Sequence, residues 1–323
     1  MRLIRMALAV VLITLPVSAR AEQKADPYKL LVAADSSSGI YMQLFEQLKK
    51  YCGDTPDINL EKIENTGGAV GNLDAVFTNK ANAGFLHSDV VMLAEKGNKQ
   101  YADFKTLLSC CPEDIQIVAL RNSRAKTGGT NLGITTVNEK TKEFNSLQDL
   151  DGYDVAAAGG GVKTMQQLVS EGRAGFNPNA FEKGGDLLPA LKEGKVHAVI
   201  FVGAAPLKII ADLSRSEYKL IPIGDSIAAR LKSMYRSTQI TYPNLLADQV
   251  QTMAPMATMV TRPVRAPIVK KALAGLRKCY AENLSLIQDT VGTHPKWREA
   301  IEWDRGVWYW LPLEGDQDPA QNK

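Results

Sequence analysis

The stretch that decides the fold is residues 58–90, INLEKIENTGGAVGNLDAVFTNKANAGFLHSDV, in which two strand-like runs are each followed by a helical pattern. Alternating apolar and polar residues predict a strand over 58–63, and the next pattern predicts a helix over 69–78. A short strand over 83–86 and a helix over 89–96 repeat the unit. Strands that alternate with helices favour α/β layers around mostly parallel sheets.

The same alternation extends along the chain in two series. A polar segment over 122–143 separates them and is expected to form a long hairpin or loop. We therefore expect two lobes, the first formed by 28–121 with 252–323 and the second by 122–251. The remaining predicted strands cover 28–34, 115–120, 154–158, 198–202, 219–222 and 252–261. The remaining predicted helices cover 40–51, 163–171, 186–193, 206–213 and 268–289.

Length and charge exclude several classes of function. The chain has 323 residues, 45% of them hydrophobic, which is typical of two folded domains. Its 38 basic and 35 acidic residues give a formal net charge of +3, and Arg2, Arg5 and Arg20 account for that surplus. Because basic and acidic residues are equal in number over the rest of the chain, we expect no extended positive surface that would bind nucleic acid or an anionic membrane. A few local groups can still hold a small anion.

Residues 1–21 have the order of features found in export signals. Two early arginines precede an apolar run over 6–17, and Ala19-Arg20-Ala21 fits a cleavage site before Glu22. The run is shorter than the ~20 residues that cross a bilayer, and no cysteine follows it as an acceptor for lipid. We expect a soluble mature protein in the periplasm; an N-terminal anchor or a buried helix is the alternative.

The four cysteines fit an oxidising compartment but are too few for a disulfide scaffold. No histidine lies near a cysteine in sequence, so we expect neither a zinc site nor another metal or cofactor. Buried free thiols and two bridges, each using one of the adjacent pair, are both open interpretations. Because two of the cysteines lie on helices of the expected first lobe, we predict at least one bridge from Cys52 or Cys279 to Cys110 or Cys111.

Four loops share one pattern, in which a strand ends, small polar or glycine residues follow, and a helix begins. Such loops present the free N–H groups and positive dipole end of a helix to an anion, at the strand ends where open α/β sheets bind ligands. Helix capping is the alternative for any single loop. The candidate ligand-binding residues in or beside these loops are Ser37, Ser38, Gly39, Tyr41, Thr66, Gly67, Gly68, His87, Ser88, Asp89, Gly161, Val162, Lys163 and Thr164.

No enzyme motif stands out in the sequence. Val162 occupies the position before Lys163-Thr164 at which a phosphate-binding loop requires glycine. Thr164 stands where a dinucleotide fingerprint has its third glycine. The patterns G-x-S-x-G and H-E-x-x-H do not occur, and no pair of carboxylates stands out as an acid–base couple. We therefore expect a binding protein rather than an enzyme.

An ordered set of segments resembles the TAXI-type solute receptors of TRAP transporters, over about residues 29–262. Ile63–Leu73 (IENTGGAVGNL) and Ala83–Val90 (AGFLHSDV) resemble the first lobe of that family. Cys111-Pro112-Glu113 resembles its proline–glutamate turn before the crossing strand. The resembling segments of the second lobe are Ser146–Gly152, Val155–Thr164, Leu191–Ala198 and Gly203–Pro206.

The resemblance implies a type II periplasmic-binding-protein fold, with two α/β lobes, a hinge and a ligand cleft that Gly203 and Ala204 help to close. It implies a small anionic solute such as glutamate or a dicarboxylate, delivered to TRAP membrane subunits by a monomer. A same-fold receptor for an ABC importer or sensor, and a periplasmic enzyme, are the alternatives. Val162 and Lys163 depart from the Ser-Gly usual in this family; Lys163 is expected to pair with a bound carboxylate, or else to be a solvated surface lysine.

The tryptophans gather at one end of the chain, within its last 27 residues. We expect this segment to pack as a tail over the first lobe. Docking to a partner is the alternative, because aromatic residues are enriched at the cores of interfaces. The four residues are Trp297, Trp303, Trp308 and Trp310.

Cleavage of the export signal gives a first prediction. Mature protein recovered from the periplasm should begin at Glu22, because the small residues at the cleavage site end at Ala21. N-terminal sequencing or intact-mass measurement would check this. A soluble periplasmic form that retains residues 1–21 would contradict it.

Overall fold

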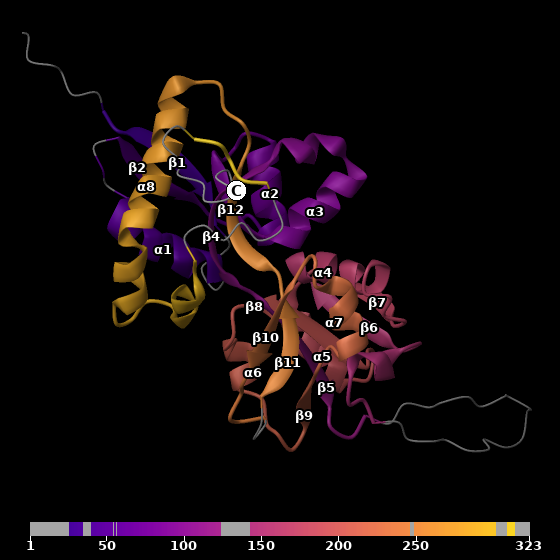
Figure 1. The fold of residues 1–323 in the computed structure, drawn as a ribbon. Coiled ribbons are helices and arrows are strands. Elements are labelled where there is room, and N and C mark those ends of the chain that lie inside the picture. Colours follow the sequence, from indigo (N-terminus) through magenta and orange to yellow (C-terminus); the bar gives the residue numbers. More distant parts are fainter. Residues whose placement is uncertain are drawn as a thin grey trace, which may run out of the picture.

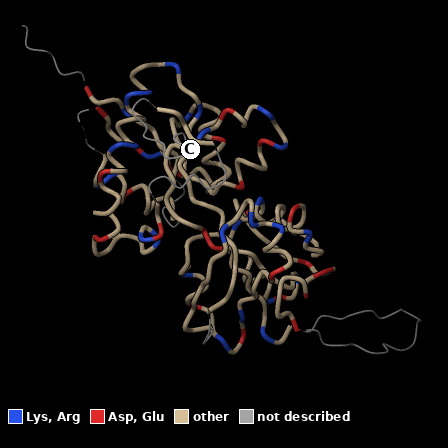
Figure 2. The backbone as a smooth tube through the Cα atoms, in the orientation of Figure 1, with Lys and Arg blue, Asp and Glu red and all other residues tan. Residues whose placement is uncertain are grey.

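The computed structural model describes residues 26–34, 40–53, 55, 57–123, 143–245, 249–301 and 309–313. These residues form two lobes, each built around a five-stranded sheet (Figure 1). The expected export signal and most of the polar segment 122–143 lie outside the described residues. Basic and acidic residues are interspersed along the backbone of both lobes (Figure 2), as the balanced charge of the sequence predicts.

The first lobe has the sheet order β2-β1-β3-β12-β4. β1 pairs in parallel with β2 and β3, whereas β12 is antiparallel to both β3 and β4. The strands of this lobe are β1 (Tyr28–Ala33), β2 (Ile58–Ile63), β3 (Ala83–His87), β4 (Lys105–Pro112) and β12 (Met256–Thr261). Its helices are α1 (Ile40–Cys52), α2 (Ala69–Phe77), α3 (Ser88–Gly97) and α8 (Pro267–Asp289), with 3-10 turns at Lys99–Asp103 and Pro295–Glu299.

The second lobe has the sheet order β7-β6-β8-β5-β9, in which β5 runs antiparallel to both of its neighbours. A two-stranded antiparallel ribbon, β10 with β11, lies beside this sheet. The strands are β5 (Asp114–Leu120), β6 (Asp154–Ala158), β7 (Asn177–Phe181), β8 (Ala198–Gly203), β9 (Tyr218–Ile221), β10 (Arg236–Ile240) and β11 (Val250–Ala254). The helices are α4 (Gly160–Ser170), α5 (Leu187–Lys192), α6 (Lys208–Ala211) and α7 (Asp225–Leu231), with 3-10 turns at Leu147–Leu150 and Gly184–Asp186.

Two short connections carry the chain between the lobes. Glu113 is the one residue between β4 of the first sheet and β5 of the second. Pro255 separates β11 from β12 on the return, and its carbonyl accepts a hydrogen bond of 2.8 Å from Glu113 N–H. The expected boundary at residue 121 is therefore wrong, because β5 pairs with β8 and β9. The single strand expected over 252–261 is instead divided between β11 and β12, because Pro255 has no N–H group to donate to a sheet.

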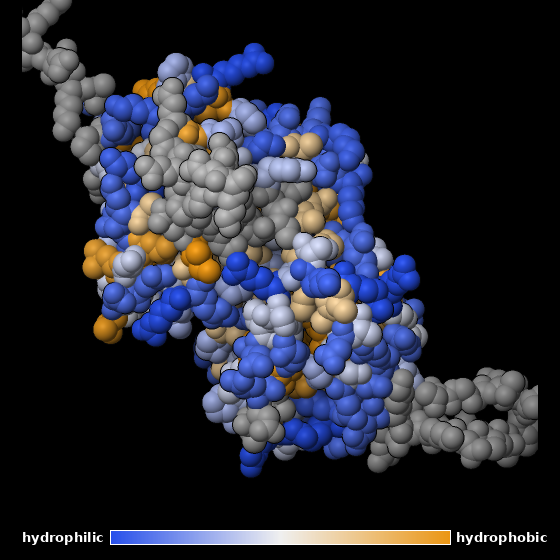
Figure 3. Space-filling view, in the orientation of Figure 1, coloured by the Kyte–Doolittle hydropathy of each residue, from blue (hydrophilic) through white to orange (hydrophobic). Residues whose placement is uncertain are grey.

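The C-terminal segment returns to the first lobe, as the sequence predicts. Apolar residues on one face of α8 lie in the core of this lobe, and Trp297 is fully buried beside Tyr280. Trp310 forms an isolated parallel bridge with Thr106 of β4. Trp303 and Trp308 lie outside the described residues. The visible face of the molecule is mostly hydrophilic, with apolar side chains in separate groups (Figure 3).

Four elements were absent from the sequence prediction, and three of them have weak local signals. β7 (NPNAF) and β10 (RSTQI) are polar, and α7 has seven residues, so none of the three carries a strong hydrophobic period. β4 (KTLLSCCP) is an apolar run that is almost entirely buried. Long-range pairing with β12 defines it as a strand.

The predicted bridge to the adjacent cysteines is wrong. Cys52 and Cys279 are bonded to each other, with their Cα atoms 5.8 Å apart, and Cys110 and Cys111 are buried free thiols. The physical reason is that successive residues of an α-helix point in different directions. Tyr280 of α8 points to β4, where its hydroxyl donates to the Ser109 carbonyl. The preceding residue, Cys279, therefore points elsewhere and lies beside the end of α1.

This pairing predicts how the thiols react. Native, unreduced protein should label slowly with iodoacetamide, because Cys110 and Cys111 are buried and burial raises the pKa of the Cys110 thiol. Unfolding in guanidinium without reductant should expose those two thiols while Cys52 and Cys279 stay unlabelled. Mass mapping of the peptides would measure this. A bridge from either adjacent cysteine to another residue would contradict the structure.

Candidate functional site

Three of the four predicted loops meet at Gly160, the first residue of α4. A Cβ atom placed on Gly160 would overlap Nε2 of His87 and lie 3.0 Å from Cβ of Ala69. His87 ends β3 and Ala69 begins α2, so this point joins the two lobes. Glycine is required here because any side chain would push the lobes apart.

Asp89 forms the central polar contact between the lobes. Its carboxylate is fully buried and accepts hydrogen bonds from Thr164 Oγ1 (2.8 Å) and the Tyr235 hydroxyl (2.6 Å), both of the second lobe. Its other oxygen bonds Nδ1 of His87, which belongs to the same lobe as Asp89. Four side chains from β3–α3, α4 and the start of β10 thus form one network.

The charges in this network compensate each other. Burial alone would raise the pKa of Asp89, but the charge and hydrogen bond of His87, with the two hydroxyls, hold it below its ordinary value. Burial would lower the pKa of His87, but the carboxylate of Asp89 holds it above its ordinary value. The two residues are therefore a buried ion pair with almost no net charge.

Lys163 lies on the face of α4 that is turned toward the first lobe. Thr164 and Gln167 of this face contact Asp89 and Lys96, respectively, across the lobe interface. Lys163 is three residues after Gly160 and four before Gln167, which places it on that face. It is half-buried, and among the described residues it has no ion pair or hydrogen bond.

The β2–α2 loop is held by Thr66 and Asn72. Thr66 Oγ1 bonds Oδ1 of Asn72, and Asn72 Nδ2 donates to the Phe85 carbonyl at 2.6 Å. Gly71 is needed in the same turn, because a Cβ there would overlap the Thr66 carbonyl. The Thr66 hydroxyl thus positions the loop, and Gly67 and Gly68 both have φ of 84°.

Glu113 adds a buried carboxyl group at the hinge. Its Oε2 accepts a hydrogen bond of 2.6 Å from the hydroxyl of Tyr41, whose ring stacks on Phe85. Burial raises the pKa of Glu113 to about 7, although His87 and the Tyr41 hydroxyl act against this change. Tyr41 is one of the predicted ligand-binding residues, and its hydroxyl donates to Glu113 at the hinge.

The remaining predicted residues have varied positions. Ser88 is buried and its Oγ accepts from Met256 N–H, while Val162 packs against the core of the second lobe. Gly161 is buried in the first turn of α4. Gly203 and Ala204 lie beside β5: Gln116 donates to the Gly203 carbonyl, and Ala204 belongs to the first-lobe core. The predicted residues Ser37, Ser38 and Gly39 lie outside the described residues.

Sequence reasoning missed Tyr235, Asn72 and Glu113 as parts of this site. The resemblance drew attention to Glu113 only as part of a turn. Tyr235 carries no local signal, because it stands between a short helix and a polar strand. Its hydroxyl reaches Asp89 only in the folded chain, because the two residues are 146 apart in sequence.

Among the described residues of this site, no hydroxyl or thiol is paired with a histidine base as in a nucleophilic catalyst. Nε2 of His87 faces Gly160, and within the described ranges no hydroxyl or thiol bonds to it. The same part of the chain contains no group of three or more His, Cys, Asp or Glu side chains that could hold a metal ion. No described helix has the length and apolar character of a membrane span.

Comparison with known proteins identifies the family. The profile of the NMT1-like family matches residues 32–295, which is most of the chain. The chain belongs to the NMT1-like family. Its fold, two α/β lobes each built on a mixed five-stranded sheet, is similar to that of the solved structure of Tv2483, so the predicted two-lobed α/β architecture is confirmed.

Three structures illustrate how distant the similarity of this NMT1-like protein is. Tv2483 bound to L-arginine aligns with a TM-score of 0.50 at 11% identity, over 85% of this chain and 93% of that chain. AbpA, an amino acid ABC transporter substrate-binding protein from Streptococcus pneumoniae, has a TM-score of 0.45 at 12% identity, over 79% and 90%. The GluR0 ligand-binding core from Nostoc punctiforme, in complex with L-glutamate, has a TM-score of 0.41 at 17% identity, over 78% and 98%.

The raised pKa of Glu113 predicts a pH dependence of stability. In the unfolded chain the carboxyl group ionises near 4.5, but in the folded chain near 7. Between these values, rising pH favours the unfolded state, so the free energy of unfolding should fall. Glu113→Gln keeps an oxygen for Tyr41 and removes the titration. Between pH 5 and 7.5 the free energy of unfolding of the parent should fall by roughly 2 kcal/mol relative to that of this variant.

Denaturant unfolding at several pH values would measure the difference, with Glu64→Gln as a matched control on an exposed residue of the β2–α2 loop. The control should follow the parent. Parallel pH profiles for the parent and Glu113→Gln would mean that Glu113 is ionised throughout this range, against the prediction.

Proposed function

We propose that this NMT1-like protein is an exported solute-binding receptor that captures a small organic anion, such as an amino acid or a carboxylate, between its lobes. The observation that carries the proposal is Lys163, a half-buried cation without a partner among the described residues, on the α4 face at the lobe interface. Solute receptors of this architecture hold ligand between two lobes that close by a hinge.

The electrostatics of the interface favour an anion. His87 and Asp89 neutralise each other, and Glu113 has a pKa of about 7. Among the described residues, these groups leave the charge of Lys163 uncompensated. Lys163 also lies in the first turns of α4, where the N–H groups and the helix dipole attract negative charge. A ligand carboxylate here would relieve the unfavourable position of a cation at a helix N-terminus.

Closure of the lobes is part of the same proposal. Asp89 reaches across the interface to Thr164 and Tyr235, so separation of the lobes would leave a buried carboxylate with two fewer hydrogen bonds. Lys96 adds an exposed ion pair with Glu171, at 2.5 Å, on the same side. These contacts stabilise the closed arrangement, which a ligand bound between the lobes would favour further.

The receptor would deliver its solute to a membrane importer. An ABC importer is at least as good a candidate for the partner as a TRAP transporter, since AbpA is an amino acid ABC transporter substrate-binding protein. The TAXI-like segments of the sequence support the TRAP alternative. Transport by membrane subunits encoded beside this gene would separate the two, since an ABC importer requires ATP hydrolysis.

Substitution of Lys163 gives the test of the anion site. Calorimetric titration of the parent with L-glutamate, L-glutamine, L-arginine and succinate should identify at least one ligand that binds and is recovered unchanged. Lys163→Met keeps the stem and removes the charge. The binding free energy of the best anionic ligand should weaken by about 1.5–3 kcal/mol in this variant, the range for hydrogen bonds to charged groups. This corresponds to a loss of roughly ten- to a hundredfold in affinity.

Lys232→Met is the control, because Lys232 is exposed in the second lobe and forms no ion pair with any described residue. It should bind like the parent. No saturable binding of any of the four solutes would count against the proposed receptor. Equal affinity of the parent and Lys163→Met would leave the receptor function standing but remove the pairing role of Lys163. Chemical change of the bound solute would support an enzyme instead.

A further inference from the structure

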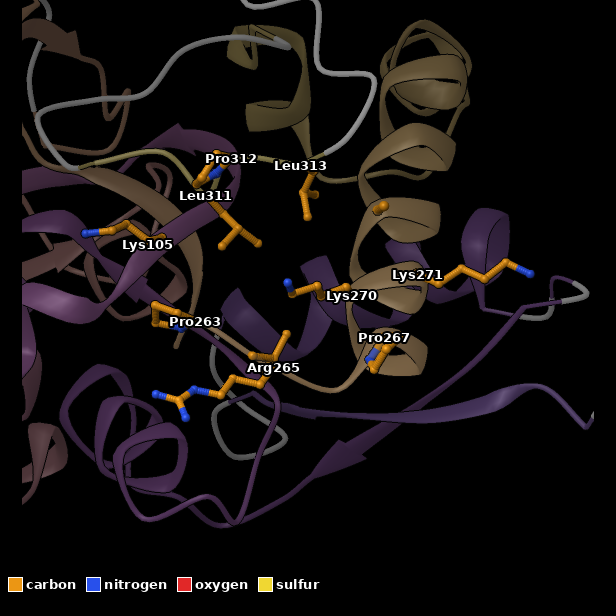
Figure 4. Close-up of a pocket in the computed structure, with 11 residues that line it drawn as sticks. Lys105, Pro263, Arg265, Pro267, Lys270, Lys271, Leu311, Pro312 and Leu313 are labelled. Carbon is orange, nitrogen blue, oxygen red and sulfur yellow. The ribbon is translucent and has the colours of Figure 1, made fainter.

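A cavity lies in the first lobe, away from the lobe interface. It has a volume of about 750 Å³ and is lined by the start of α8, the segment before that helix, and residues Leu311–Leu313 of the C-terminal segment (Figure 4). Lys105 of β4 completes the described lining. None of the described lining residues belongs to the second lobe, so a ligand here would not depend on closure of the lobes. Cavities of about 300–1,000 Å³ commonly hold small organic molecules.

The described lining carries four cations and no carboxylate. Two of the cations already have partners: Lys271 pairs with Asp57 at 2.7 Å, and Lys105 donates to the Ala102 carbonyl. Lys270 and Arg265 have no ion pair or hydrogen bond within the described part of the chain. Figure 4 shows the ammonium group of Lys270 directed into the space between α8 and Leu311. Within the described lining, these two cations therefore leave positive charge uncompensated at the mouth of the cavity.

The other walls of the cavity are apolar. Figure 4 shows the side chains of Leu311 and Leu313 pointing into it from the C-terminal segment. Val264, Ala274 and three prolines complete these walls. A small hydrophilic anion would pair with Lys270 but leave this apolar surface in contact with water. A neutral apolar molecule would cover that surface but leave the cations unpaired.

We propose that this cavity is a second binding site, for a small amphiphilic anion that consists of one carboxylate and an acyl or aryl body. The carboxylate pairs with Lys270, and the body lies against Leu311, Leu313 and Ala274. The site is separate from the proposed solute cleft and does not require that proposal to hold.

Calorimetric titration of the full mature chain with octanoate and 3-phenylpropionate tests the site. Both should bind saturably, while acetate, which lacks the apolar body, and octanol, which lacks the charge, should bind much more weakly. Lys270→Gln should weaken octanoate roughly tenfold, because it removes a charge-assisted hydrogen bond. Ala274→Phe should weaken octanoate binding because the ring takes up part of the space along the apolar wall, and its melting temperature would show that it is folded.

Two controls locate the ligand. Lys278→Gln changes a lysine of the same helix that pairs with Glu282 outside the lining, and it should bind like the parent. Lys163→Met alters the lobe interface and should also leave octanoate binding unchanged. The proposal is overturned if neither carboxylate binds below about 1 mM. It is also overturned if Lys270→Gln binds like the parent, or if Lys163→Met removes the binding.

Discussion

The hydrogen bond from Glu113 N–H to the Pro255 carbonyl joins the two places where the chain passes between the lobes. Each passage is a single residue between strands of different sheets. Relative movement of the lobes must therefore be absorbed by a few backbone dihedrals at one point, which is how a hinge works. Lys296 reinforces this point through a buried ion pair of 2.9 Å with Asp114, so the C-terminal segment is tied to the hinge.

The buried ionisable groups around this hinge differ in how their charge is balanced. Asp89 is balanced by His87 and by two hydroxyls of the opposite lobe. Burial raises the pKa of Glu113, and the hydrogen bond from the Tyr41 hydroxyl does not offset this effect. Lys163, on the same interface, has no partner in the described structure.

Local pattern in the sequence predicted most of the architecture. The strand at 58–63 agrees with β2 residue for residue, and the elements expected at 40–51, 154–158 and 268–289 differ from α1, β6 and α8 by one residue at most. These elements have strong hydrophobic periods, which are local properties of the chain. β7 and β10 do not, because their polar side chains contribute little to any apolar face and their conformation depends on pairing with β6 and β11.

The sequence by itself determined the α/β layers, the two lobes and three of the loops that meet at the interface, because each depends on residues close together in the chain. Only the tertiary structure decided that Asp89 would bond Thr164 and Tyr235, which are 75 and 146 residues away. It also decided that Cys279 would face Cys52 rather than β4, and that the chain would change lobes at Glu113. These outcomes depend on how distant elements pack against one another, which the local spacing of residue types does not specify.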